Sequence, residues 1–303
     1  DPLERTMYGV KLAAAARECG IGFLRFLPAV DGRDVAQLVS IISTRSTAGT
    51  MPERIRFGRV GLNGSMEELP GEGIVSFESM SGEQKGRLDA AFDSVSRGEK
   101  LPLSGLSAVV GGFLNAFRRE ANPFLALAPL KAMSEHAFAH SVNVCILNLA
   151  QGMSLGLEGE ALHDLGIAGL LHEAGKLQLP RQLLLPGREL SPAEREVMAT
   201  HTELGAGYLL NCEGVPAAAV LAAHRHHMLH DLQGYPPPRP GTTLDLVTEI
   251  TMISDCFDNL RAEHGEEDRA KISGLMLTAA GSALHPSLTL NFLKTMLEKA
   301  GGG

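Results

Sequence analysis

Histidines are concentrated in the C-terminal half of the chain, and several have a spacing suited to metal binding. His136 and His140 are four residues apart, so a helix would place both on one face. His172 is followed directly by Glu173, and Asp255 lies in an otherwise apolar segment. Imidazole and carboxylate ligands together suit iron, manganese, zinc or nickel, whereas magnesium and calcium prefer mostly oxygen. The pattern therefore predicts a transition-metal site.

Other histidines of this half extend the candidate set. The clustered ones are His136, His140, His172, His201, His224, His226, His227 and His230. A lone histidine in a helical protein is more often a surface or hydrogen-bonded residue than a ligand, and His163, His264 and His285 are interpreted in that way. For His224 and His230 both alternatives, ligand or solvated side chain, stay open.

Helices are expected to position these side chains. From about residue 101 onward, apolar residues recur every three to four positions, which is typical of helices with a buried face. The predicted helices cover residues 137–153, 160–171, 215–229, 244–261 and 268–284. A further helix begins at Ser191, since Pro192 suits its first turn and Glu194 can return a hydrogen bond to the cap, which would place His201 about three turns inside it. This half is predicted to be an all-α bundle of about seven helices.

The first part of the chain has a different pattern. Short apolar runs at 22–27, 54–58 and 73–77 are bounded by Gly or Pro and predict strands, while 34–42 has helical spacing. We therefore expect a small α/β domain over residues 1–100 and a helical domain over residues 101–300. The predicted fold class is mainly α, with a C-terminal helical bundle preceded by this small N-terminal domain.

Composition narrows the classes of function. The 303 residues carry a formal net charge of -8 and contain no block rich in Lys and Arg, which argues against duplex nucleic acid as a partner. The 4 cysteines form no CxxC pair, which favours a reducing compartment. No stretch approaches the roughly 18 apolar residues that a membrane span requires. We expect a cytoplasmic protein with no membrane segment in this chain, and an anionic substrate would need a local positive site such as metal ions.

Five motifs, in order, resemble those of the HD-GYP domains, a family of the HD superfamily, and the resemblance covers about residues 130–290. The matching segments are HSVNV at 140–144, LHEAGK at 171–176, LSPAE at 190–194 leading to HTELG at 201–205, HHMLHDLQGYP at 226–236, and ISDCFD at 253–258. The second resembles the family's His-Asp-x-Gly-Lys signature, and the fourth resembles the stretch that names the family.

The resemblance implies an HD-type helical fold and a phosphodiesterase of bacterial signalling. Such enzymes hydrolyse a cyclic dinucleotide, usually cyclic di-GMP, to a linear dinucleotide or GMP, using a hydroxide that bridges two or three metal ions, most often iron or manganese. Residue by residue, the implied metal ligands are His140, His172, Glu173, His201, His226, His227 and Asp255, with His136 at an extra position for a third metal. Lys176 and Glu173 are the implied catalytic residues, and Lys176 would also hold a phosphate oxygen of the substrate. Gly234, Tyr235 and Pro236 would shape a loop that binds substrate.

This sequence differs from the family pattern at several positions. Glu173 stands where the signature has Asp, Met228 where the family usually has Glu, and Leu232 where it usually has Gly. Residues 259–264 lack the family's Arg-Pro-Tyr element. These differences leave a second alternative open, a catalytically degenerate module that binds cyclic dinucleotides or transmits a signal, and a third, hydrolysis of another phosphoester. The N-terminal domain is interpreted as regulatory or dimerising, with a homodimer as one alternative for the assembly.

Overall fold

The structure, a computed structural model, describes residues 23–26, 30–44, 55–58, 80–118, 136–185, 188–265 and 268–300. The chain divides into two compact units, Asp1–Glu67 and Glu68–Gly303. The described residues are mainly helical, so the predicted fold class is confirmed. The strand predicted at 73–77 lies outside the described residues. The domain boundary near residue 100 stays a prediction, and helix α3 (Gly82–Arg97), which precedes it, lies in the second unit.

The first unit contains the small α/β arrangement that the sequence predicts. Strand β1 (Phe23–Phe26) pairs antiparallel with β2 (Ile55–Gly58), so that Phe23 lies opposite Gly58. Helix α2 (Gly32–Thr44) connects them in the chain and contacts β2. Leu38 and Ile41 are buried on α2, as is Ile55 on β2. Leu38 and Ile41, three residues apart, thus lie on one face of α2, which packs against the two-stranded sheet at β2.

The second unit is a helical bundle. Its first helix, α3, begins at a capping box in which the hydroxyl of Ser81 accepts from the backbone N–H of Gln84. The elements that follow are α4 (Leu103–Arg118), α5 (His136–Ser154), α6 (Gly159–Leu171), the 3₁₀ helices η2 (Ala174–Gln178) and η3 (Arg181–Leu184), α7 (Pro192–Ala199), α8 (His201–Leu210), α9 (Ala217–Arg225), α10 (Leu246–His264), α11 (Arg269–Ala279) and α12 (Pro286–Ala300).

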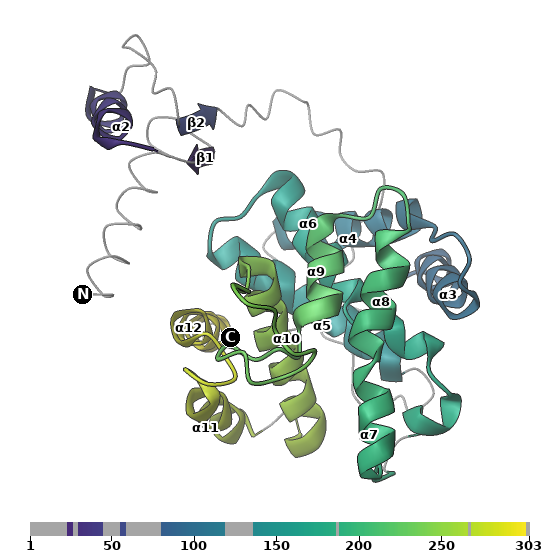
Figure 1. Cartoon of the computed structure of the whole chain (residues 1–303). Helices are drawn as coiled ribbons and strands as arrows, with labels where there is room; N and C mark the ends of the chain where they lie inside the picture. Colours follow the sequence, from purple (N-terminus) through teal and green to yellow (C-terminus); the bar gives the residue numbers. More distant parts are fainter. Residues whose placement is uncertain are drawn as a thin grey trace. The chain divides into compact units, whose positions relative to one another are not determined.

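Two apolar clusters hold this bundle together. The larger joins α3, α4, α5, α6 and α9 and includes the fully buried Phe113, Ile146 and Leu165. The smaller joins α10, α11 and α12 through residues such as Phe257 and Phe292, whose rings meet edge to face. Figure 1 shows α10, α11 and α12 together on one side of the bundle and α8 and α3 on the other, with α9 between them. In the middle of the bundle, α9 contacts α6, α8 and α10, and α5 contacts α6 and α10.

Three predicted helices differ from those observed. The helix that starts at the Ser191 capping box ends at Ala199, because the N–H and hydroxyl of Thr200 both turn back to the carbonyl of Val197. His201 therefore begins a new helix, α8, and does not lie three turns inside the first. The helix predicted over 215–229 ends at Arg225, and the one over 268–284 ends at Ala279. Apolar spacing does not reveal these ends, because local side-chain and turn hydrogen bonds set them.

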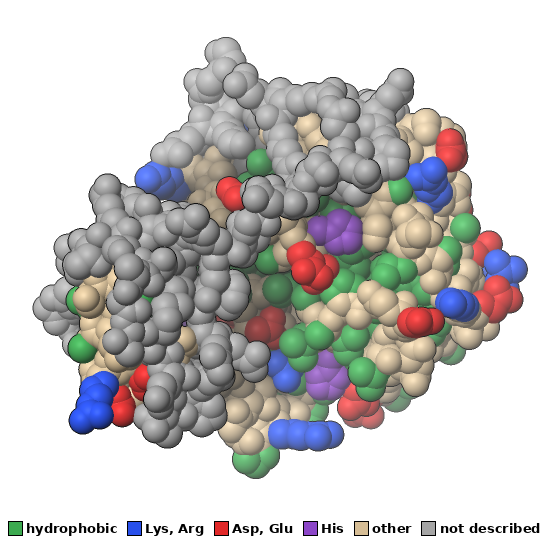
Figure 2. Space-filling view, turned by 90° about the horizontal axis from the view of Figure 1, so that it is seen from above, with side chains coloured by type: hydrophobic (Ala, Val, Ile, Leu, Met, Phe, Trp, Pro, Cys, Tyr) green, Lys and Arg blue, Asp and Glu red, His purple; other side chains and the backbone are tan. Residues whose placement is uncertain are grey.

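None of the helices in the described ranges combines the length and the apolar content needed to span a bilayer. On the face drawn in Figure 2, Lys and Arg side chains of the described residues are interspersed with Asp and Glu.

Candidate metal centre

The predicted ligand residues come from five elements that converge inside the helical bundle. His140 lies within α5 and Asp255 within α10. The other histidines lie at helix ends: His172 caps the C-terminus of α6, His201 begins α8, and His226 caps the C-terminus of α9. Side chains at helix ends can point beyond the end of the helix, so residues from several helices can converge on one point. The histidine rings accordingly lie side by side, for example His172 and His226 with centroids 5.0 Å apart.

Two glycines allow the close approach that brings these elements together. A Cβ at Gly175, in η2, would clash with the backbone of α8 at the carbonyl oxygen of His201. A Cβ at Gly169, in α6, would lie 2.7 Å from the Cα of Cys145 on α5. Only a residue without a side chain fits at either point. Gly175 thereby places Glu173 beside the start of α8, and Gly169 brings α6 against α5.

The side chains form two groups that share one carboxylate. His140, His172, Glu173 and Asp255 each offer a ligand atom, and all four atoms lie within 4.8 Å of one another. The second group consists of Glu173, His201, His226 and His227, under the same limit. Glu173 belongs to both, with Oε2 3.4 Å from Nε2 of His201. Two adjacent sites joined by one bridging carboxylate is an arrangement that suits a pair of metal ions.

The ring tautomers are set so that nitrogen lone pairs face inward. Nδ1 of His172 donates to the carbonyl of Gly169 at 2.8 Å, and Nδ1 of His201 donates to the carbonyl of Met198 at 2.7 Å. A carbonyl oxygen can only accept, so each Nδ1 carries the proton and each Nε2 is left as an acceptor. Nδ1 of His226 donates in the same way to the carbonyl of Ala222. Metal-ligating histidines characteristically bond their other ring nitrogen in this manner.

Burial leaves some of these inward atoms without a hydrogen-bond partner. Among the described residues, Nε2 of His172 and Oε2 of Glu173 are buried and have none. Nε2 of His201 and Nε2 of His226 lie 3.3 Å apart, and both are acceptors in the tautomers above, so the two lone pairs face each other. Unsatisfied acceptors pointing at one space cost free energy unless a cation occupies it. The donor set therefore fits a metal ion.

The protonation states of the second group also favour a metal. Burial lowers the pKa of His227 to about 4 and that of His226 well below its ordinary value. Burial likewise lowers the pKa of His201. All three imidazoles are therefore neutral near pH 7, the form that binds metal.

The carboxylates are held in their ionised form. Burial raises the pKa of Glu173, but the positive charge of the neighbouring Lys176 outweighs burial and holds the pKa well below its usual range. Burial acts in the same direction on Asp255, and the neighbouring His140, whose Nε2 lies 3.1 Å from Oδ1 of Asp255, outweighs it. Both side chains are thus anionic ligands ready for a cation.

The comparisons with known proteins agree with this geometry. The family model described as HD domain matches residues 127–278, half of the 303-residue chain. The chain belongs to the HD domain family. The match covers the elements from α5 to α11 and confirms the family resemblance predicted from the sequence motifs.

Two curated relatives extend the similarity of this HD domain. A cyclic di-GMP phosphodiesterase of Pseudomonas aeruginosa is 26% identical over 238 residues, which are 78% of this chain and 56% of that protein. A 3′3′-cGAMP-specific phosphodiesterase of Vibrio cholerae is 31% identical over 129 residues, 43% of this chain and 30% of that protein. The chain thus spans about half the length, or less, of these relatives.

A solved structure supports the fold. A protein described as HDG"Y"P, from Bdellovibrio bacteriovorus, matches with a TM-score of 0.59 and 15% identity, covering 71% of this chain and 70% of that chain. The HD-type helical arrangement is therefore shared.

Lys176 lies beside Glu173, at the edge of the candidate metal centre. Its ammonium is 2.6 Å from Oε1 of Glu173, and the side chain is one-third exposed. Burial lowers the pKa of Lys176, but the charge of Glu173 outweighs burial and raises it, so Lys176 is a cation. A partly exposed cation beside the ligand groups can contact an anionic substrate.

The predicted substrate loop lies against the second group. The Tyr235 ring is 4.7 Å from that of His227, centroid to centroid. A Cβ at Gly234 would clash with the carbonyl oxygen of His227, so glycine is required there. Pro236 is buried. Leu232 has φ 63, in the left-handed region that favours glycine, which gives a physical reason for the glycine that the family usually has there.

Some relationships were missed by sequence reasoning. Asp258 accepts a hydrogen bond from His140, although the sequence singled out only Asp255, three residues earlier on the same face of α10. His230 donates to Oε1 of the buried Glu249 at 2.8 Å and lies outside both ligand groups. The sequence signal that could have identified Asp258 is a carboxylate within a mostly apolar helix. The backbone of His136 begins α5, but its side chain lies outside the described part, so its role stays a prediction.

Proposed function

We propose that this chain is a metal-dependent phosphodiesterase that hydrolyses a cyclic dinucleotide, with cyclic di-GMP as the first candidate substrate and a linear dinucleotide or GMP as product. The observation that carries the proposal is the pair of buried ligand groups joined at Glu173, with imidazole lone pairs directed inward. The names of the curated relatives, which specify cyclic di-GMP and 3′3′-cGAMP, support this substrate class.

The metal ions are proposed to be two transition ions, iron or manganese, with a third if His136 contributes. His140, His172, Glu173 and Asp255 would hold one, and Glu173, His201, His226 and His227 the other. Bound metals supply Lewis acidity at the phosphoryl group and generate a nucleophile from water at neutral pH. The mixed imidazole and carboxylate set favours transition ions over magnesium or calcium.

The side chains around the metals are proposed to orient the substrate. The ammonium of Lys176 would pair with a non-bridging phosphate oxygen, and would exchange part of its contact with Glu173 for that interaction. Tyr235, held by Gly234 and Pro236 against His227, would form one wall of the substrate site. The aromatic ring offers a surface on which a base of the dinucleotide can stack.

The test is hydrolysis of cyclic di-GMP by protein reconstituted anaerobically with iron or manganese, with metal content measured on the same sample. We expect linear product from the wild type, and loss of both metal and product in His172→Ala. His163→Ala is the matched control, since His163 is partly exposed and lies outside both ligand groups.

Other outcomes distinguish the alternatives. Bound metal without any product from cyclic di-GMP or 3′3′-cGAMP would favour the degenerate binding module, for which Glu173, Met228 and Leu232 are the specific departures. Product from 3′3′-cGAMP alone would keep the chemistry and change the substrate. Absence of bound metal in the wild type would contradict the proposal.

We also propose that the N-terminal unit is regulatory or dimerising. Helix α3 packs on α4 and η2, so a deletion that preserves the bundle ends at Glu67 and not near residue 100. Sedimentation and turnover of the chain lacking residues 1–67 provide the measurement. Unchanged assembly and unchanged turnover would contradict this role.

A further inference from the structure

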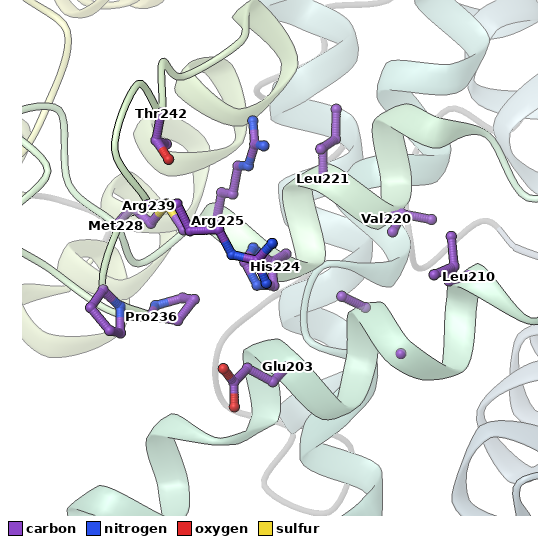
Figure 3. Close-up of a pocket in the computed structure, with 13 residues that line it drawn as sticks. Glu203, Leu210, Val220, Leu221, His224, Arg225, Met228, Pro236, Arg239 and Thr242 are labelled. Carbon is purple, nitrogen blue, oxygen red and sulfur yellow. The ribbon is translucent and has the colours of Figure 1, made fainter.

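A second cavity lies outside the metal centre, on another face of α8 and α9. Its volume is about 480 Å³, within the range of about 300–1,000 Å³ typical of small-ligand sites. Glu203 from α8, His224 and Arg225 from α9, and Arg239 from the following loop supply its polar lining. In Figure 3, His224 lies between Glu203 at one end of the lining and Thr242 at the other.

This cavity is separate from the predicted ligands. None of the ligand residues lines it. His201 and Glu203 are two positions apart on α8, about 200° around the helix, so they face different sides. The cavity does share Pro236 with the loop that carries Tyr235, and Met228 also lines it. A ligand here would contact the predicted substrate loop at Pro236.

The charged side chains of the cavity are open to a ligand, since Glu203 and Arg239 are both exposed. In the part of the chain that the structure describes, the side chains of Glu203 and Arg239 have no ion-pair partner. Arg225 is 3.5 Å from Asp245, a long ion pair that leaves room for another acceptor. All three charged groups line the same cavity as His224. Side chains of opposite charge therefore line one cavity and are accessible to a ligand.

Apolar side chains complete the cavity. Val220 and Leu221 of α9 lie on one wall, and Met228 and Pro236 on another. Leu210 is 74% exposed at its edge, an unusual exposure for a leucine on a helix of the bundle. An occupant should thus combine an apolar, flat body with an anionic group.

We propose that this cavity binds a guanosine monophosphate, with its phosphate on Arg225 and Arg239, its base against Val220, Leu221 and Pro236, and the base edge on Glu203. Guanidinium groups match phosphate oxygens in number and geometry. The adjacent N1–H and N2–H donors of guanine match the two oxygens of a carboxylate, whereas adenine places an acceptor beside its amine. One nucleotide thus matches both the arginines and the carboxylate that line the cavity.

The inference deepens the proposed function, since GMP is one of the two products proposed for cyclic di-GMP hydrolysis. It rests on that function for the source of the nucleotide, while binding itself can be measured without turnover. Because Pro236 lies in both the cavity and the substrate loop, a bound product nucleotide would act on that loop.

The experiment is isothermal titration of GMP into the full chain after metal removal by a chelator, so that metals cannot bind the phosphate. AMP and inorganic phosphate are titrated in parallel. We expect GMP to bind more tightly than either, Arg239→Gln to weaken GMP by about ten-fold or more, and Glu203→Gln to abolish the preference for GMP over AMP. Arg195→Gln, an exposed arginine outside the cavity, is the matched control.

Two results would overturn the proposal: no saturable GMP binding, or equal GMP affinity in Arg239→Gln and Arg195→Gln. If metal removal abolishes cooperative unfolding, the same comparison is made on manganese-loaded protein. There, the difference in GMP affinity between the wild type and Arg239→Gln measures binding in the cavity. If the chain binds GMP in this way but hydrolyses no cyclic dinucleotide, the nucleotide site is supported and the phosphodiesterase activity is contradicted. The two proposals can therefore fail separately.

Discussion

Nδ1 of His140 lies 2.8 Å from Oδ2 of Asp258, and the two residues are joined across α5 and α10 by a partly buried hydrogen bond. The other carboxylate oxygen of Asp258 accepts from Nδ2 of Asn143 at 2.9 Å. Nε2 of the same imidazole lies 3.1 Å from Asp255. Burial lowers the pKa of His140, but the two carboxylates outweigh it and raise the pKa to about 10. Asp258 thus fixes the ring so that Nε2 faces the metal centre.

The first prediction concerns this hydrogen bond. Asp258→Asn removes the charge that orients His140, and we expect metal affinity to fall by about 10–100-fold, as for other partners of metal-bound histidines. Competition with a chelating dye measures the affinity, and retained cooperative melting shows that the fold persists. Asp164→Asn is the control, because Asp164 is partly exposed beside His163 and outside the centre. Equal affinity in the two variants would rule out an orienting role for Asp258.

The second prediction concerns stability on metal removal. The ligand groups direct buried acceptors and ionised carboxylates at one space, so bound metal should stabilise the folded chain. At a free metal concentration about 1,000 times Kd, the gain is about 4 kcal/mol, which corresponds to several degrees in Tm. Calorimetry with manganese and with a chelator gives the shift. His172→Ala should show little of it, and a full shift in that variant would argue that the metal binds elsewhere.

The third prediction concerns the contact between η2 and α8. Gly175→Ala places a methyl group against the carbonyl of His201, and backbone cannot move aside as a flexible side chain can. We expect a loss of about 3 kcal/mol or more in the free energy of unfolding, the upper end of what overpacking costs. Gly274→Ala, in α11, meets no atom within 4 Å and should gain about 0.5–1 kcal/mol. Urea denaturation compares them, and similar values for both would show that η2 is not tightly packed.

The fourth prediction concerns a buried amide that connects three helices. Nδ2 of Asn148, on α5, donates to the carbonyl of Leu165 on α6 and to the hydroxyl of Thr251 on α10. Asn148→Ala leaves both acceptors buried without their donor, which should cost about 1–3 kcal/mol. Asn211→Ala is the control, since the Asn211 amide is exposed and bonds only within its own turn, to Gly207. Chemical denaturation gives the free energy of unfolding of both variants. If Asn148→Ala loses no more stability than Asn211→Ala, water replaces the amide.

Local features of the fold were predictable from the sequence. The capping box at Ser191 and Glu194 was identified from residue types alone, since it needs only neighbours within one turn. The short strands at 23–26 and 55–58 followed from apolar runs bounded by Gly or Pro. The break at Thr200 was not predictable, because Pro192 to Leu210 has continuous helical character and the turn hydrogen bonds that interrupt it are weak local choices.

For the candidate site, the sequence by itself determined the types and order of the ligand residues, because imidazole and carboxylate chemistry is a property of each side chain. Only the tertiary structure decided how they group: Glu173 joins both sets, and Asp258, 118 positions from His140, orients that ring. It also decided that Glu203 and Arg239, unremarkable in the sequence, share one cavity. Distances between residues far apart in the chain depend on how helices pack, and packing reflects the whole core and not any one motif.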